Sequence, residues 1–400
     1  MSLYRLSKKA VFVAVILTTF CSASNYYVSP SGLDSHSGLA SSCADTGNAW
    51  KTIGHAAATY AAGDTLNVCD GTYAEGFTLS TNGTAGAPVV FQSVNKWGAK
   101  VTPRDVSGTN LVNIGGNYVT FKNFDVTGTP NSNTTIKCNG ATHCSIVGNR
   151  IHDSGVQSSV CNSGAAVQLS SDNDAVIGNE IYNVGVPRTA GFRCNQFHGI
   201  YYGNGINSVI QNNVIFEVWQ GYGIHINASG NVTGATVSDN TVFNSGDNTG
   251  GGTGSPSGGA EVLDCHATCS GNTFTNNIFA NNQGPSACFR EVLESSATMS
   301  SNTYSNNNLF NCGSNTMVAG SIGNTVTGNP TFVNYTGDQN GDYHLQARSP
   351  DIGAGTSVGA PSIDFAGSAR PQGNRYDIGA VEFVATTAPD PPSNLTDTVD

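Results

Sequence analysis

Two short phrases in the sequence could bring four carboxylates together. Glu261-Val-Leu-Asp264 is repeated as Glu291-Val-Leu-Glu294, and Arg290 directly precedes the second phrase. If the phrases stack on neighbouring strands, like charges repel, so one carboxyl keeps its proton or a cation binds between them. A retained proton suits acid and base catalysis on a glycosidic bond, with Glu261 and Glu291 as the pair.

A bound cation is the second interpretation of the same cluster. Calcium prefers hard oxygen ligands, so we expect Asp264 and Glu294 to be the ligands if Ca²⁺ binds there. The third interpretation is a group of surface acids that Arg290 partly neutralises. The spacing alone leaves all three open.

A different set of residues could support elimination from a sugar acid. Removing the proton next to a uronate carboxyl requires a base and a group that neutralises the carboxylate. The sequence has no lysine after Lys137, which excludes a lysine base in the central part of the chain. A lone histidine is more often a turn residue than a catalyst. The candidates that remain are Arg193, His198, Tyr201, His225 and Arg290.

These residues lie within a repeated pattern. An Asn-x-apolar-aromatic phrase recurs at intervals of 30, 33, 28, 36 and 31 residues. Such a period predicts a solenoid, and short β-branched runs broken by Gly, Asn, Ser and Asp predict a parallel β-helix. We interpret the repeated asparagines as scaffold, because Asn tolerates left-handed backbone and can hydrogen-bond to its own kind in stacked turns. They are Asn149, Asn179, Asn212, Asn240, Asn276 and Asn307.

Aligning the repeats by these asparagines places five polar residues at equivalent positions between apolar neighbours. Side chains alternate along a strand, so if the neighbours face the core these five point outward, about 4.8 Å apart from coil to coil. They are Gln168, Tyr201, His225, Glu261 and Glu291. We expect Gln168 and Arg193 to bind substrate, and outward Tyr201, Tyr202, Trp219 and Tyr222 to stack against sugar rings.

Composition and the chain ends set the domain organisation. Only 11% of the 400 residues are charged and 49 are Gly, which suits turn-rich, all-β structure. Residues 1–24 combine a basic start, a short apolar run and small residues, as in a secretory signal peptide. Residues 25–383 hold the β-helix, with a capping helix expected at Trp50–Tyr60 and strands at Thr65–Val68 and Pro88–Ser93. Residues 384–400 form a Pro-rich linker.

Ten cysteines remain after the predicted signal peptide. An even number in an exported chain predicts disulfides, so we expect a secreted, extracellular protein. Pairing sequence neighbours gives Cys43–Cys69, Cys138–Cys144, Cys161–Cys194, Cys265–Cys269 and Cys288–Cys312.

The charge balance restricts the possible partners. The net charge of −11 becomes −14 when Arg5, Lys8 and Lys9 leave with the signal peptide. Nucleic acid is then a poor partner, because binding phosphates needs a basic face. A polyanionic sugar would need local positive charge or a bridging divalent cation. The apolar run of the predicted signal peptide is too short to span a membrane, and no other run comes close. We expect a monomer.

Both ends of the predicted β-helix resemble a known family. The start, YYVSPSGxDSxSG followed by WKTIxHAAATxxxGDTLxVxxGTY, and the end, DYHLQARSPDIGAGTSVG with IDFAGSARPQGNRYDIGAVEF, are similar to secreted right-handed parallel β-helix proteins of the pectate-lyase-like superfamily. The resemblance implies that fold for residues 25–383. That superfamily includes lyases, hydrolases, epimerases and binding proteins without catalytic activity, so it does not specify one reaction. The tail PDPPSNLTDTV resembles the first strand of a fibronectin type III module.

The leading expectation is a carbohydrate-active enzyme that acts on an extracellular polysaccharide along an outer groove. The family resemblance favours a polysaccharide lyase that cleaves a uronate-containing polymer. The carboxylate cluster favours a glycoside hydrolase instead. A cell-surface or adhesion protein without catalytic activity is the third alternative.

Overall fold

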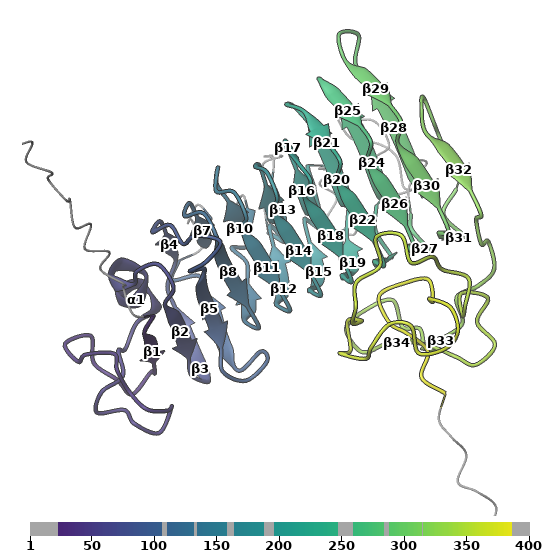
Figure 1. The fold of residues 1–400 in the computed structure, drawn as a ribbon. Helices are drawn as coiled ribbons and strands as arrows, with labels where there is room; N and C mark the ends of the chain where they lie inside the picture. The colour runs from purple at the N-terminus through teal and green to yellow at the C-terminus, as the bar shows by residue number, and fades with distance from the viewer. Residues whose placement is uncertain are drawn as a thin grey trace, which may run out of the picture.

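The computed structural model describes residues 23–105, 110–131, 134–157, 164–187, 196–246, 259–283, 288–313 and 315–385. Three long sheets run along one elongated stack of coils, and the strand pairs within them are parallel (Figure 1). This arrangement is typical of a right-handed parallel β-helix and confirms the predicted fold class. The predicted signal peptide, apart from its last two residues, lies outside the described residues, as does residue 386 onward of the predicted linker.

Within the described residues the strands belong to five sheets. The eleven-stranded sheet contains β1 (Asn25–Val28), β2 (Thr65–Val68), β5 (Val89–Ser93), β8 (Val119–Lys122), β11 (Ser145–Val147), β14 (Ala175–Ile177), β18 (Val209–Gln211), β22 (Thr236–Ser238), β26 (Thr273–Thr275), β30 (Thr303–Ser305) and β32 (Ser321–Gly323). The nine-stranded sheet contains β3 (Gly71–Ala74), β6 (Ala99–Thr102), β9 (Asp125–Thr127), β12 (Arg150–Ser154), β15 (Glu180–Val184), β19 (Val214–Val218), β23 (Thr241–Phe243), β27 (Ile278–Ala280) and β31 (Asn308–Phe310).

The eight-stranded sheet contains β4 (Phe77–Leu79), β7 (Val112–Ile114), β10 (Thr134–Cys138), β13 (Gly164–Leu169), β16 (Phe197–Tyr202), β20 (Tyr222–Ala228), β24 (Gly259–Cys265) and β28 (Phe289–Leu293). A four-stranded sheet joins β17 (Gly205–Ile206), β21 (Val232–Thr233), β25 (Thr268–Ser270) and β29 (Thr298–Ser300). The last two strands, β33 (Phe332–Asn334) and β34 (Asp342–Leu345), pair antiparallel.

The core is built from rows of apolar side chains that repeat from coil to coil. In the eight-stranded sheet, Ile136, Val167, Ile200 and Ile224 lie in register, and each is fully buried. Successive side chains of a strand face opposite sides, so the residues on either side of this row point outward. The register of the core row therefore determines which side chains reach the surface of this sheet.

The repeated asparagines serve as scaffold, as predicted, but in two different ways. Asn212 and Asn276 adopt left-handed backbone with φ of 55° and 56°. The residues that follow them, Asn213 and Asn277, belong to a buried ladder of asparagines, in which each Nδ2 donates to the Oδ1 of the asparagine in the next coil at 2.9–3.1 Å. The ladder, in order, is Asn149, Asn179, Asn213, Asn240, Asn277 and Asn307.

A helix covers the first end of the stack, and a returning segment covers one side of it near the other end. Helix α1 (Ile53–Thr59) lies at the N-terminal end of the coils, as predicted, and the side chain of Thr52 caps it by accepting from the His55 N–H (Figure 1). Near the other end, the segment after β33 returns and packs on the nine-stranded sheet through a separate apolar cluster. Buried Arg370 fixes this segment by donating to Glu382 at 2.7 Å.

Four of the five predicted disulfides are confirmed: Cys43–Cys69, Cys138–Cys144, Cys265–Cys269 and Cys288–Cys312. The fifth, Cys161–Cys194, lies outside the described residues. The described part of the chain contains no helix with the length and apolar character that a membrane crossing requires.

Replacing one ladder asparagine should destabilise the protein strongly. In Asn179→Ala, the Ile146 carbonyl and the Asn149 N–H would lose their bonds to the Asn179 amide, at 2.9 Å each. Unpaired buried groups cost about 1–3 kcal/mol each, so we expect the free energy of unfolding to fall by about 2–4 kcal/mol. Urea unfolding followed by circular dichroism measures it, with exposed Asn334→Ala as the matched control. Equal stability of the two variants would contradict a structural role for the ladder.

Candidate active site

Six side chains form an outward row on the eight-stranded sheet. Adjacent strands lie about 4.8 Å apart, so the row extends roughly 24 Å. From β10 to β28 it consists of Lys137, Gln168, Tyr201, His225, Val262 and Arg290. The structure thus confirms that Gln168, Tyr201 and His225 occupy equivalent positions.

The expectation that Glu261 and Glu291 continue this row is wrong. Glu261 is in register with Ile224 of the core row, and Glu291 is in register with Leu263. Both side chains point inward, with exposed fractions of 1% and 2%. Counting from the asparagines missed a shift of one residue at β24 and β28, and such a shift moves a side chain to the other face of a sheet.

The two buried glutamates have very different surroundings. Glu291 accepts hydrogen bonds from the backbone N–H groups of Val318, Ala319 and Gly320 at 2.8–2.9 Å, and from the Tyr304 hydroxyl at 3.1 Å. It therefore joins the segment after β31 to the coil stack. In contrast, neither carboxyl oxygen of Glu261 has a hydrogen-bond partner among the described residues. Burial raises the pKa of Glu261 well above its ordinary value.

A cleft of about 330 Å³ opens on the outward face between β16 and β28. It combines several of the predicted residues with others from the same strands. Its lining consists of Gln196, His198, Tyr201, Tyr222, His225, Asn227, Val262, Asp264, Arg290 and Val292. Among the described residues, this cleft brings together the largest number of the groups predicted for catalysis.

Two histidines lie in contact in this cleft. His225 Nδ1 is 2.8 Å from His198 Nε2, and the Tyr222 backbone N–H donates to His198 Nδ1 at 3.1 Å. Burial lowers the pKa of His198 well below its ordinary value, and nearby His225 lowers it further. Burial, with a contribution from His266, lowers the pKa of His225 to about 3. Both imidazoles are therefore neutral at neutral pH.

The other polar groups of the cleft surround this pair. Arg290 Nη1 donates to the Tyr222 hydroxyl at 3.2 Å, which directs the guanidinium back from β28 towards β20. Burial and the charge of Asp264 raise the pKa of Tyr201, so its hydroxyl stays protonated at neutral pH. Burial also raises the pKa of Asp264, while His266 opposes that shift and Glu294 adds to it.

Asp264, His266 and Glu294 form a cluster whose nearest ligand atoms lie within 4.8 Å of one another. The sequence predicts Asp264 and Glu294 as ligands of Ca²⁺. Calcium takes six to eight oxygen ligands, and the imidazole of His266 offers nitrogen instead. Asp264 and Glu294 do come together, but this cluster alone does not fit calcium.

Several predicted binding residues lie elsewhere. The prediction that Tyr202 points outward is wrong, because its side chain points into the core and is fully buried. Trp219 lies outside the cleft lining, and its indole N–H donates to Asn183 Oδ1 at 2.6 Å. Tyr222 lines the cleft but is only 6% exposed, which leaves little ring surface for a sugar. Arg193 lies outside the described residues.

Three further residues lie on the outward face, although the sequence did not predict them as site residues. Asn227 lies two residues after His225 on β20 and lines the cleft, as strand alternation could have predicted. Gln196, which directly precedes β16, also lines the cleft. Lys137 begins the outward row next to Gln168, whose Oε1 accepts from the Thr134 hydroxyl at 3.0 Å.

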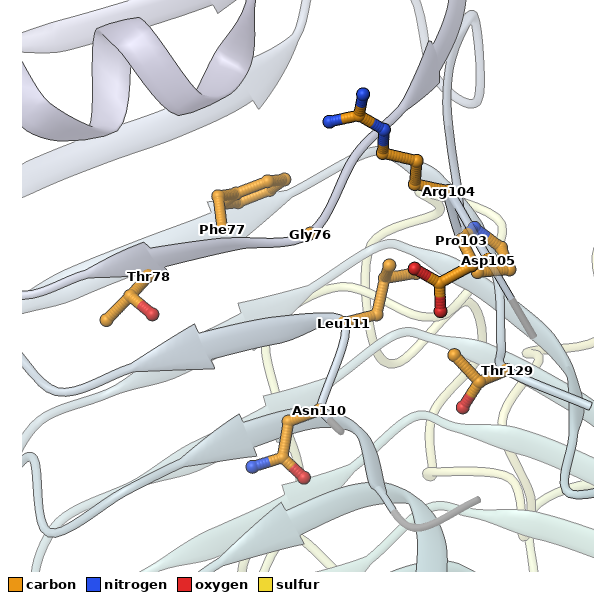
Figure 2. Close-up of a pocket in the computed structure, with 9 residues that line it drawn as sticks. All are labelled: Gly76, Phe77, Thr78, Pro103, Arg104, Asp105, Asn110, Leu111 and Thr129. Atoms are coloured by element: carbon orange, nitrogen blue, oxygen red, sulfur yellow. The ribbon is translucent and has the colours of Figure 1, made fainter. Parts of the chain in front are cut away.

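Other hollows offer fewer groups for proton transfer. One hollow, of about 320 Å³, lies beside β4 and β7. Figure 2 shows that Arg104 and Asp105, two of the residues that line it, extend in different directions. Another, of about 390 Å³, lies on the nine-stranded sheet beneath Tyr343. We therefore place the candidate active site in the cleft between β16 and β28.

Glu261→Leu should stabilise the protein at neutral pH. The folded chain keeps the Glu261 proton, whereas the unfolded chain releases it once the pH exceeds its ordinary pKa, so this glutamate destabilises the wild type increasingly as pH rises. Leucine would remove that cost and the unpaired oxygens. We expect about 1–3 kcal/mol more stability at pH 7 and a smaller gain at pH 4.

The matched comparison is Glu291→Gln, which should destabilise the protein because three backbone N–H groups would lose their bonds to a charged oxygen and the Tyr304 hydroxyl would face an NH2 group instead of an acceptor. Urea unfolding at both pH values measures the two variants. A Glu261→Leu variant less stable than wild type at pH 7 would show that Glu261 has a partner the structure does not give it.

No protein-family model and no curated protein matches this chain. Several solved structures are similar to it at low sequence identity. The pectate lyase Pel9A is 18% identical, with 90% of this chain and 96% of that chain covered and a TM-score of 0.47. XylC in complex with xylose is 12% identical, with 90% and 98% covered and a TM-score of 0.43. An alginate lyase from Paenibacillus sp. str. FPU-7 is 16% identical, with 69% and 95% covered and a TM-score of 0.36. TM-scores below 0.5 carry no argument about activity, so the fold assignment rests on the sheet topology.

Proposed function

We propose that this chain is an exported carbohydrate-active enzyme that binds a uronate-containing polysaccharide and cleaves it by β-elimination. The observation that carries the proposal is the cleft in which Tyr201, His225, Asp264 and Arg290 come together on the outward face. The four disulfides among the described residues support export, because such bonds persist in oxidising compartments.

The shape of the outward face suits a polymer. A second, smaller hollow of about 90 Å³ adjoins the cleft, with Tyr201 contributing to both. Thr134 and Gln168 line this hollow, so polar side chains continue from β28 to β10. Lys137 and Arg290 bring two positive charges to this face, and Asp264 and Glu294 bring two acidic groups to it. The Arg290 guanidinium is therefore the group in the cleft lining that offers a ligand carboxylate an opposite charge.

The cleft also contains the groups that β-elimination needs. A base takes the proton next to the carboxyl, the C–O bond to the neighbouring sugar breaks, a C=C bond forms, and the leaving oxygen gains a proton. Arg290 presents a guanidinium, whose shape matches a carboxylate. Protonated Tyr201 suits proton donation to the leaving oxygen. Asp264 is a further titratable group in this lining, and as a carboxylate it can take up the proton.

Ultraviolet absorbance of the protein incubated with a panel of uronate polysaccharides tests the reaction. β-Elimination creates an unsaturated, absorbing product, so we expect absorbance to rise with at least one polymer. Parallel reactions with added calcium and with a chelator test whether a divalent cation is required. A flat trace without new reducing ends across the panel would contradict the enzyme and favour a binding protein.

Arg290→Gln should reduce the activity sharply. The variant loses the charge proposed to neutralise the uronate carboxylate, and removing one such electrostatic group costs about 100-fold in rate. Exposed Arg348→Gln is the matched control and should behave like the wild type. Equal kcat/KM for the two variants on the best substrate would remove Arg290 from the mechanism.

Glycoside hydrolysis is the second candidate, and one observation favours it. Carboxylate oxygens of Asp264 and Glu294 lie no more than 4.8 Å apart at the edge of the cleft, and retaining glycosidases likewise use two neighbouring carboxyl groups, about 5 Å apart. Glu261 and Glu291, the acid and base pair predicted from the sequence, do not support this reaction because both are buried. New reducing ends without absorbance would identify hydrolysis.

A further inference from the structure

We infer that His225 is locked as a neutral hydrogen-bond donor whose Nε2–H binds the uronate carboxylate together with Arg290. His198 is then a positioning residue that fixes the tautomer of His225 without touching the substrate. The ligand in this inference rests on the proposed function. The two tautomers belong to the unliganded protein and can be measured without any substrate.

The lock begins at a backbone group that can only donate. The Tyr222 N–H donates to His198 Nδ1 at 3.1 Å, so that nitrogen carries no proton. A neutral His198 must therefore carry its proton on Nε2, which lies 2.8 Å from His225 Nδ1. His225 Nδ1 accepts this hydrogen bond, and the proton of neutral His225 must be on Nε2. The opposite assignment would place two N–H groups against each other at Tyr222.

Close packing keeps the lock in place. Gly221 precedes the donor, and a Cβ at that position would lie 1.7 Å from the Phe197 carbonyl oxygen and 3.0 Å from His198 Nδ1. A side chain there would force this backbone away from the imidazole. His198 itself is 4% exposed, so water has little access to compete for its nitrogens. The lowered pKa of both histidines agrees with rings that remain neutral.

The lock determines what His225 can do in the cleft. Its ring centroid lies 5.4 Å from that of Tyr222, whose hydroxyl accepts from Arg290. His225 and Arg290 both line the cleft, so the imidazole N–H and the guanidinium are two donors within one cleft. Two donors suit an oxyanion such as a carboxylate. His225 in this tautomer has no lone pair left on Nε2 to remove a proton, which leaves Asp264 and Tyr201 for the proton transfers.

Long-range ¹H–¹⁵N spectra of the full chain labelled with ¹⁵N-histidine test the lock directly. Such spectra distinguish rings protonated at Nδ1, at Nε2 or at both, and His198→Gln and His225→Gln assign the signals. We expect the Nε2–H pattern for both rings at neutral pH. His344 is an internal reference, because its Nδ1 faces a carboxylate oxygen of Asp342 at 2.6 Å and must carry a proton there.

Two substitutions of His198 separate positioning from packing. Glutamine offers an acceptor for the Tyr222 N–H and a donor for His225, whereas phenylalanine fills the space without either. We expect His198→Gln to keep the Nε2–H pattern of His225 and most of the activity. His198→Phe should give mixed tautomers of His225 and a kcat/KM at least about tenfold lower, since a wrong tautomer is unproductive. Exposed His344→Gln is the activity control.

The outcomes distinguish this inference from the proposed function. A proton on Nδ1 of His198 or His225, or an unchanged tautomer of His225 in His198→Phe, overturns the lock even if uronate polymers are cleaved. The predicted tautomers in a protein that neither binds nor cleaves any uronate polymer overturn carboxylate binding and the proposed function together.

Discussion

A buried asparagine amide in each central coil ties that coil to the next. Asn179, for example, accepts from the backbone and side chain of Asn149, and donates to the Ile146 carbonyl and to Asn213. Each bond satisfies a polar group that water cannot reach, so sliding one coil against its neighbour would leave several such groups unpaired. The spacing and register of the three sheets depend on this constraint.

Register in turn decides which residues are available for chemistry. Along β24, Glu261 points into the core while Val262 and Asp264 line the cleft. A shift of one residue would turn Glu261 outward and bury Asp264. The same register brings His225 next to Tyr201 and places Arg290 two strands away. The cleft is therefore a product of stacked strands, to which the turn before Tyr222 adds the hydrogen bond that orients His198.

The fold was largely predictable from sequence because it depends on repeated local signals. Asparagine spacing, β-branched runs and neighbouring cysteines correctly indicated the solenoid, the capping helix and four disulfides. The outward row was predictable as far as His225. The prediction was wrong at Glu261 and Glu291, because the loops between coils differ in length and counting residues along the chain cannot detect a shift of one residue. The contact between His198 and His225 was also beyond the sequence, since it depends on how a single turn packs.

We propose that a polyuronate lies across β16 to β28 with a carboxylate held by Arg290 and His225. A crystal structure of the protein soaked with a uronate oligosaccharide tests this most directly. We expect sugar along the outward row, with one carboxylate oxygen within hydrogen-bond distance of His225 Nε2 and another at the Arg290 guanidinium. An oligosaccharide bound in the hollow beneath Tyr343 or in that beside β4 and β7, with the cleft free of sugar, would contradict it.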